Sequence, residues 1–212
     1  EAGAGRIIVG EGGAPVPKTL DSFTVMDAFE KTGTLDVCKK HDVEVVCLDD
    51  EDWEIRTVPN GVIYRDVRLF KSIVSVDKLI SVPVMKTHYD TDVSLGIKCW
   101  HGVIADADKF WKYHRDDINQ KLVDLIRALN PVLTVIDGIT AMEGLGPLGG
   151  ESLTMNLITA SGDPLAVDAT TARIMGFDPY EVDHFRIAYQ QGVGKMYENE
   201  IDVVGETVDS VK

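Results

Sequence analysis

The stretch Leu79-Ile80-Ser81-Val82-Pro83-Val84-Met85-Lys86-Thr87-His88 contains the pattern that decides the fold, an apolar run of strand length that stops at a polar cluster. Similar runs end at polar or glycine-rich clusters in residues 6–13, 132–138 and 157–164. Helical patterns separate several of these runs, which indicates an α/β fold with a mostly parallel sheet flanked by helices. Because the carboxyl ends of parallel strands meet at one edge, we expect the four clusters to gather there.

The composition favours one domain of a cytoplasmic protein. A chain of 212 residues with 44% apolar composition can form a single core, and no internal segment resembles a flexible linker. Its formal charge of -14 would repel nucleic acid and anionic membranes. The apolar runs are too short to cross a bilayer, and no signal peptide is evident. Since the sequence begins at Glu1 rather than at methionine, we treat residues 1–212 as one α/β domain that lacks an upstream segment.

The cysteines argue against a disulfide framework or a zinc knuckle. Cys38, Cys47 and Cys99 are three in number and form no Cys-x-x-Cys pair. A four-iron cluster normally requires four thiolates, so we expect an iron-sulfur cluster only through a separate or missing module. Free thiols in a reducing compartment fit this pattern.

Local signals predict several elements. Asp21-Ser22 indicates a helix start, and a short helix is expected at residues 34–41. Asn60-Gly61 predicts a small antiparallel hairpin between residues 53–58 and 62–64. Residues 66–76 fit either a strand or a helix, and we favour a short helix. The apolar stripe of residues 118–129 predicts a helix from about residue 116, with a strand at 132–136 after it.

A further helix is predicted after Asp163, which can cap it, with Pro164 in its first turn and Gly176 at its end. On this helix Asp168 falls on the apolar face, whereas Thr170 and Arg173 fall on a different side.

Basic residues after the quoted strand are candidates for binding an anion. Lys86 and Thr87 could hold a carboxylate or phosphate, and His88 could carry a proton or bind a metal. Alternatively, these residues simply meet water at a strand end. If residues 93–101 form a helix, Ser94, Lys98 and His101 share one face and could meet the same anion.

Acidic residues supply the other half of the predicted site. Asp137 and Asp168 could bind a divalent cation or act as an acid and base pair. Alternatively, Asp137 orders its loop and Asp168 pairs with a buried lysine. Gly144 and Gly146 belong to a mobile or tightly turned loop that could close over the ligand, although it lacks the lysine-serine ending of a P-loop.

His88, His101 and His114 are evenly spaced, thirteen residues apart. The segments between them are not alike, and the spacing is not a known zinc pattern. The identity of any metal therefore stays unknown at this level.

Four blocks occur together in one order: residues 82–88, residues 95–102, residues 137–147 and residues 162–168. In this arrangement the chain resembles the family called domain of unknown function 362, and residues 173–206 continue the likeness. The resemblance implies an α/β protein whose relatives often carry or accompany ferredoxin-like modules and whose reaction is generally unassigned. A distant fold relation to the nickel-pincer lactate racemase family is also expected.

Two features depart from the family pattern. Members usually have an additional amino-terminal segment, and Cys99 stands where the pattern leads us to expect asparagine after Lys98. The first difference bears on the completeness of the site, and the second changes the chemistry beside Lys98.

The preferred hypothesis is an enzyme core that binds a small anionic molecule, with redox or isomerase chemistry. Lys86 and Lys98 would orient the ligand, while His88, Asp137 or Asp168 would handle protons or a divalent metal. One alternative is a noncatalytic scaffold that docks an iron-sulfur electron-transfer module, such as a ferredoxin-like domain. Another is a structural domain with a vestigial site.

Overall fold

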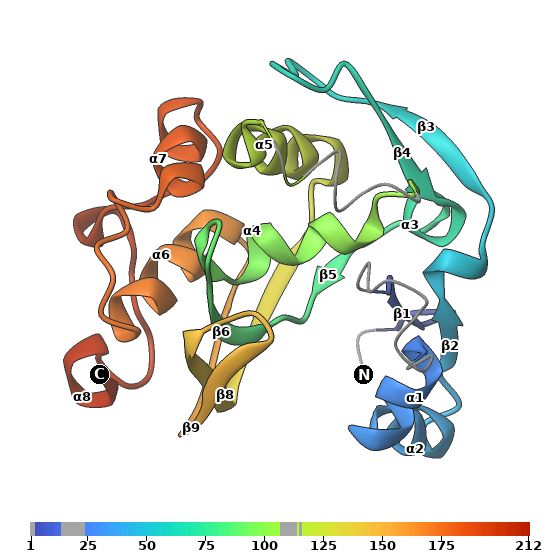
Figure 1. Ribbon diagram of the computed structural model, residues 1–212, viewed down its shortest axis with the longest axis horizontal. Coiled ribbons are helices and arrows are strands. Elements are labelled where there is room, and N and C mark those ends of the chain that lie inside the picture. The colour runs from blue at the N-terminus through green and yellow to red at the C-terminus, as the bar shows by residue number, and fades with distance from the viewer. Residues whose placement is uncertain (1–2, 14–23, 107–113, 115) are drawn as a thin grey trace.

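The amino-terminal part forms a small α/β unit. The computed structural model describes residues 3–13, 24–106, 114 and 116–212, so the helix signal at Asp21-Ser22 lies outside the described residues. Two parallel strands and two helices make up this unit: β1 (Ile8–Glu11), β2 (Glu44–Cys47), α1 (Val25–Lys31) and α2 (Thr34–Lys40). The helix predicted at residues 34–41 is confirmed. In Figure 1 the unit lies on the opposite side of the molecule from the carboxyl terminus.

A short 3-10 helix, η1 (Leu48–Asp50), leads into the expected antiparallel hairpin. Its strands are β3 (Trp53–Thr57) and β4 (Asp66–Phe70), and α3 (Lys71–Ser75) follows directly. The prediction of residues 62–64 as the second strand was wrong, and the helix expected within residues 66–76 is confined to its second half. The amides of Val62, Ile63 and Tyr64 instead donate to the buried carboxylate of Asp124, at 2.7 to 3.1 Å.

The central sheet contains five strands, namely β5 (Ile80–Ser81), β6 (Val84–His88), β7 (Asp92–Ser94), β8 (Leu133–Leu145) and β9 (Gly149–Ser161). β5 and β6 pair with β8 in parallel, as expected, whereas β7 and β9 are added antiparallel to β6 and β8. Pro83 lies between β5 and β6, where a residue without an N–H interrupts the ladder. The α/β class with flanking helices and a small antiparallel hairpin is therefore confirmed.

The long β8–β9 hairpin changes the expected arrangement of the polar clusters. β8 does not end at Asp137 but continues to Leu145, and β9 then runs back beside it. Ser161, at the carboxyl end of β9, pairs with Thr134 at the beginning of β8. The cluster at residues 161–164 therefore lies at the opposite end of the hairpin from Gly144 and Gly146, and the four clusters do not share one edge.

Helices cover one face of this sheet. They are α4 (Gly96–Cys99), which continues into the 3-10 helix η2 (Trp100–Val103), then α5 (Ile118–Leu129), α6 (Pro164–Ile174) and α7 (Asp183–Gln190). Figure 1 shows α4, α5, α6 and α7 on the same side of the β6–β8–β9 layer. The core between them includes Ile97, Leu125 and Phe185, all fully buried. The tail carries a 3-10 helix, η4 (Glu198–Glu200), and α8 (Val208–Val211).

The apolar stripe and the capping signals identified two of these helices correctly. α5 begins at Ile118 and ends at Leu129, two residues later at its start than predicted. Asp163 caps α6 by accepting the amides of Leu165 and Ala166, and Pro164 begins the helix. By contrast, the helix predicted at residues 93–101 begins only at Gly96, because Ser94 pairs with Lys86 in the sheet.

The fold makes a prediction about Asp124. Both carboxylate oxygens of Asp124 accept backbone amides of residues 62–64. In Asp124→Asn only one side-chain oxygen remains as an acceptor, and the new NH₂ group faces backbone N–H groups with which it cannot form a hydrogen bond. We expect Asp124→Asn to reduce the free energy of unfolding by about 1–3 kcal/mol. Chemical denaturation monitored by circular dichroism measures this change. The exposed Asp36→Asn variant serves as the control, and equal stability of both variants would contradict the assigned role.

Candidate functional site

A buried carboxylate fixes the position of the short helix α4. Asp168 of α6 is fully buried and accepts the backbone amides of Gly96 and Ile97, both at 2.8 Å. These amides are unpaired donors at the helix start, so a carboxylate satisfies them. Burial raises the pKa of Asp168 to about 7, although both hydrogen bonds oppose the shift. Asp168 therefore acts on the backbone that carries Lys98 and is not paired with the lysine side chain.

Gly96 allows this close approach. A Cβ atom at this position would lie 2.5 Å from Cγ2 of Thr134 in β8 and 2.8 Å from Oδ1 of Asp168. The start of α4 is thus wedged between β8 and α6, where no larger residue fits. This close packing fixes the distance between α4 and the sheet, and with it the position of Lys98.

Lys98, two residues after Gly96, is 7% exposed. Among the described residues its ammonium has no hydrogen bond or ion pair. Burial lowers the pKa of Lys98 to about 8, and the nearby charge of Lys86 lowers it further while Cys99 and Asp90 oppose the shift. A buried cation without an anionic partner is unfavourable unless a ligand supplies the charge or the amine loses its proton.

His88, on β6, lies beside this lysine. The backbone amide of Asp90 donates to Nδ1 of His88 at 3.1 Å, so the neutral ring carries its proton on Nε2. The pKa of His88 falls to about 3 because the ring is desolvated and because Lys98, His114 and Lys86 are close. His88 is therefore a neutral imidazole at physiological pH.

His184 of α7 completes the group and was not singled out as a site residue by the sequence. It is fully buried, and neither ring nitrogen has a hydrogen-bond partner among the described residues. Its pKa falls to about 3 through burial, with further contributions from Lys98 and His88. We call Lys86, His88, Lys98 and His184 the basic cluster. Its members come from β6, α4 and α7, and Lys98 is close enough to influence the charge of His88 and His184.

The three evenly spaced histidines also converge, which their spacing did not reveal. The ring of His114 stacks on His88 with centroids 5.9 Å apart and lies 4.5 Å from the ring of His101. In the described part of the chain, however, no three histidine, cysteine, aspartate or glutamate side chains are arranged to hold a metal ion. A divalent metal thus remains a prediction without geometric support.

Asp137 does not join the basic cluster. It pairs laterally with Val84 and Ile158, whose side chains are exposed, whereas its neighbour Ile136 is fully buried toward the helices. Since adjacent strand residues point to opposite faces, Asp137 lies on the face away from Asp168. Its carboxylate accepts the amide of Ile139 at 2.9 Å, which supports the alternative that it orders the local chain.

Thr87, Gly144 and Gly146 form a structural contact at the tip of the β8–β9 hairpin. The hydroxyl of Thr87 donates to the carbonyl of Gly144 at 2.9 Å, and the amide of Tyr89 donates to the carbonyl of Gly146 at 3.2 Å. A Cβ on Gly146 would lie 2.1 Å from the carbonyl oxygen of Thr87. Of the two forms expected for the glycine loop, the structure shows the tightly turned one. A role of these three residues in ligand binding stays a prediction.

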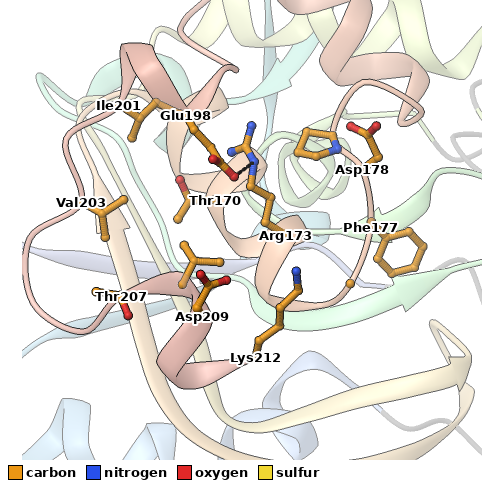
Figure 2. Close-up of a pocket in the computed structure, with 13 residues that line it drawn as sticks. Thr170, Arg173, Phe177, Asp178, Glu198, Ile201, Val203, Thr207, Asp209 and Lys212 are labelled. Carbon is orange, nitrogen blue, oxygen red and sulfur yellow. Dashed lines mark ion pairs between the residues drawn. The ribbon is translucent and has the colours of Figure 1, made fainter.

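A separate hollow of about 580 Å³ lies between α6 and the carboxyl-terminal tail (Figure 2). Thr170 and Arg173 line it, which confirms that they lie on a different side of α6 from Asp168. The guanidinium of Arg173 is already engaged, with Nε 3.3 Å from Glu198 and a hydrogen bond of 2.5 Å to the carbonyl of Met196. Lys212, the other cation that lines this hollow, is exposed, whereas Lys98 in the basic cluster is buried.

The fold and the cluster together define an α/β protein in which a helix anchored by a buried carboxylate holds an unpaired lysine beside neutral histidines. A sequence model of the family described as domain of unknown function (DUF362) matches residues 1–173. The chain belongs to this family, as its ordered blocks predicted.

A curated relative is the thylakoid-associated protein sll1697 of Synechocystis sp., which is 28% identical over 185 residues. The match covers 84% of this chain and 56% of that relative, so the chain spans little more than half of the relative's length. No solved structure matches. The expected relation to the lactate racemase family stays a prediction.

The helices of the described residues include none that is long and apolar enough to span a membrane.

The tight packing around Gly96 can be tested by replacing it with alanine, which adds one methyl group. We expect Gly96→Ala to lower the free energy of unfolding by about 1–3 kcal/mol, because both the strand and the capping carboxylate must move. Gly162→Ala is the matched control, since its Cβ would have its nearest contact at 3.5 Å. Thermal denaturation of both variants provides the measurement. A loss no larger than that of the control would show that α4 is not tightly wedged.

Burial of neutral His184 predicts an acid dependence of stability. The pKa of His184 in the folded protein is about 3, below the ordinary histidine value of 6.5, so the unfolded chain binds the proton more tightly. The contribution of His184 is present above pH 6.5 and is lost as the pH falls toward 3, at up to about 1.4 kcal/mol per pH unit. Denaturation curves from pH 7 to pH 4 should show a smaller loss for His184→Phe than for the wild type. His41→Phe, at an exposed site, should follow the wild type, and identical slopes for all three proteins would refute the assignment.

Proposed function

We propose that this chain binds a small compound bearing a carboxylate or phosphate at the basic cluster, as part of an enzyme that moves a proton at that site. The observation that carries the proposal is Lys98, a buried residue whose ammonium is unpaired among the described residues of a protein with a formal charge of -14. Acidic side chains are abundant in this chain, yet none forms an ion pair with this lysine in the described residues. A ligand anion would supply the missing charge.

The surrounding groups fit the recognition of an anion. Lys86 is half-buried and close enough to lower the pKa of Lys98, so two cations face a common region. An anion between them would relieve their mutual repulsion as well as the desolvation of Lys98. Binding should therefore raise the pKa of Lys98, weaken as the pH rises above 8, and level off below that value because the free amine is then already protonated.

The histidines provide the proposed chemistry. His88 presents a neutral ring whose Nδ1 is held by the amide of Asp90, which leaves the Nε2–H for contact with a ligand. A bound anion would favour the protonated imidazolium, so the ring can exchange a proton with a ligand oxygen or carbon. Asp168 supports the site by holding α4 in place. Redox and isomerase chemistry are both compatible with this arrangement.

The scaffold alternative assigns the chain a docking role for a ferredoxin-like module. The acidic composition is compatible with a basic partner, but no feature of the described residues specifies an iron-sulfur protein. A cytoplasmic location likewise remains part of the proposal.

Anion binding is tested by ligand-induced stabilisation. We expect phosphate or malate to raise the Tm of the wild type beyond the effect of sodium chloride at equal ionic strength. Lys98→Met should bind the same anion at least about tenfold more weakly, equivalent to about 1.4 kcal/mol. Without the anion this variant should be at least as stable as the wild type, because an unpaired buried charge is replaced by an apolar chain of similar length.

The exposed Lys39→Met variant is the control and should keep the full anion response. If Lys98→Met retained the stabilisation by phosphate or malate, the site would lie elsewhere. If the wild type showed no response to any carboxylate or phosphate, the scaffold alternative would be favoured.

A further inference from the structure

The surroundings of Lys98 suit a lysine that reacts as well as one that binds. A lysine amine attacks a carbonyl carbon only in its uncharged form, which an exposed lysine rarely adopts at neutral pH. Desolvation, together with a neighbouring cation, is the combination that activates Schiff-base lysines. Lys98 shows both features, because it is 7% exposed and lies beside Lys86.

The absence of a partner for Lys98 is important for this chemistry. Among the described residues no carboxylate forms an ion pair with its ammonium, and the more distant influence of Asp90 and Cys99 does not outweigh the desolvation of the amine. Asp168 does not serve as a counter-ion for Lys98, because its two oxygens accept the backbone amides of Gly96 and Ile97. With a pKa of about 8, roughly one amine in ten would be uncharged at pH 7.

The remaining members of the basic cluster supply the other requirements. Lys86 offers a positive charge for a carboxylate at a second point of the same ligand. His88 and His184 are neutral imidazoles in the immediate surroundings of Lys98. Neutral imidazoles can accept and return the protons that imine formation requires.

We propose that Lys98 is a Schiff-base lysine whose Nζ condenses with the carbonyl carbon of a small oxo acid, while Lys86 holds the carboxylate. This inference rests on the proposed function and names its substrate class. It makes Lys98 a catalytic residue rather than only a ligand-binding one.

The reaction balances without an oxidant or a reductant. The lone pair of the uncharged Nζ forms a bond to the carbonyl carbon, and the electron pair of the C=O bond moves to oxygen, which takes a proton from the solvent. The nitrogen then releases a proton to a neighbouring imidazole, which gives a carbinolamine. The C–O bond breaks as that imidazole returns the proton, and water leaves. The product is a protonated imine, which withdraws electrons from the adjacent carbon and eases proton removal or loss of a carboxylate there.

The experiment traps the imine in the full chain. The protein is incubated with pyruvate or acetoacetate and reduced with sodium cyanoborohydride, which converts an imine into a stable secondary amine. Intact mass and peptide mapping locate the adduct. We expect one major adduct on the peptide that contains Lys98, forming faster as the pH is raised from 6 to about 8 and then levelling off.

The variants separate reaction at this site from general labelling of lysines. Lys98→Met should lose the major adduct, whereas Lys39→Met should retain it. Lys86→Met should still form it, but the oxo acid concentration for half-maximal labelling should rise at least tenfold. Labelling spread evenly over exposed lysines, or unchanged in Lys98→Met, would overturn the inference.

Phosphate and malate distinguish failure of this inference from failure of the proposed function. Neither anion can form an imine, so their stabilisation of the protein reports binding alone. If they stabilise the wild type through Lys98 and no oxo acid is trapped there, the imine is refuted and anion binding stands. If neither stabilisation nor trapping occurs, both proposals fall.

Discussion

The contact between the carboxylate of Asp168 and the amides of Gly96 and Ile97 is the interaction on which the rest of the site depends. It joins α6 to the start of α4 directly above Thr134 of β8. The helix is only four residues long and could not hold its own position, since such short helices are not stable alone. Its position comes from this cap and from the missing side chain of Gly96.

The contact between Asp168 and α4 determines the environment of the Lys98 ammonium. α4 is held deep enough that Lys98 is buried, and the capping carboxylate is used on the backbone rather than on the ammonium. The result is a lysine with a lowered pKa, surrounded by histidines that are kept neutral by the same burial. Groups perturbed together by desolvation and by neighbouring charges are typical of functional sites. A purely structural cluster would be expected to contain its own counter-ion, and none is paired with Lys98 in the described residues.

Local sequence signals predicted those parts of the fold that depend on neighbouring residues. The apolar stripe of α5 follows from residue spacing, and the cap at Asp163 follows from the chemistry of one side chain. The pairing of β9 with β8 could not be read in this way, because it depends on contacts between separate segments. This pairing is what carries β8 past Asp137, and the alternation of side chains along that strand places the carboxylate on the other face of the sheet.

The sequence predicted some residues of the candidate site and missed others. Lys86, His88 and Lys98 were identified from their position after a strand and within a family block, and the structure brings them together. His184 carried no such local signal, since a histidine within a helix is usually a packed or exposed residue. Its proximity to Lys98 depends on how α7 packs against the rest of the chain. The convergence of His114 on His88 and His101 is also a property of the tertiary fold alone.

The most direct test of the account is the titration of the Lys98 ammonium itself, observed by NMR in protein labelled with ¹³C at lysine Cε and assigned with Lys98→Met. The account predicts that one lysine titrates near pH 8 in the free protein and that its pKa rises when phosphate or malate is added. A Lys98 resonance that titrates near 10.5, like an exposed lysine, and that does not respond to either anion would contradict it.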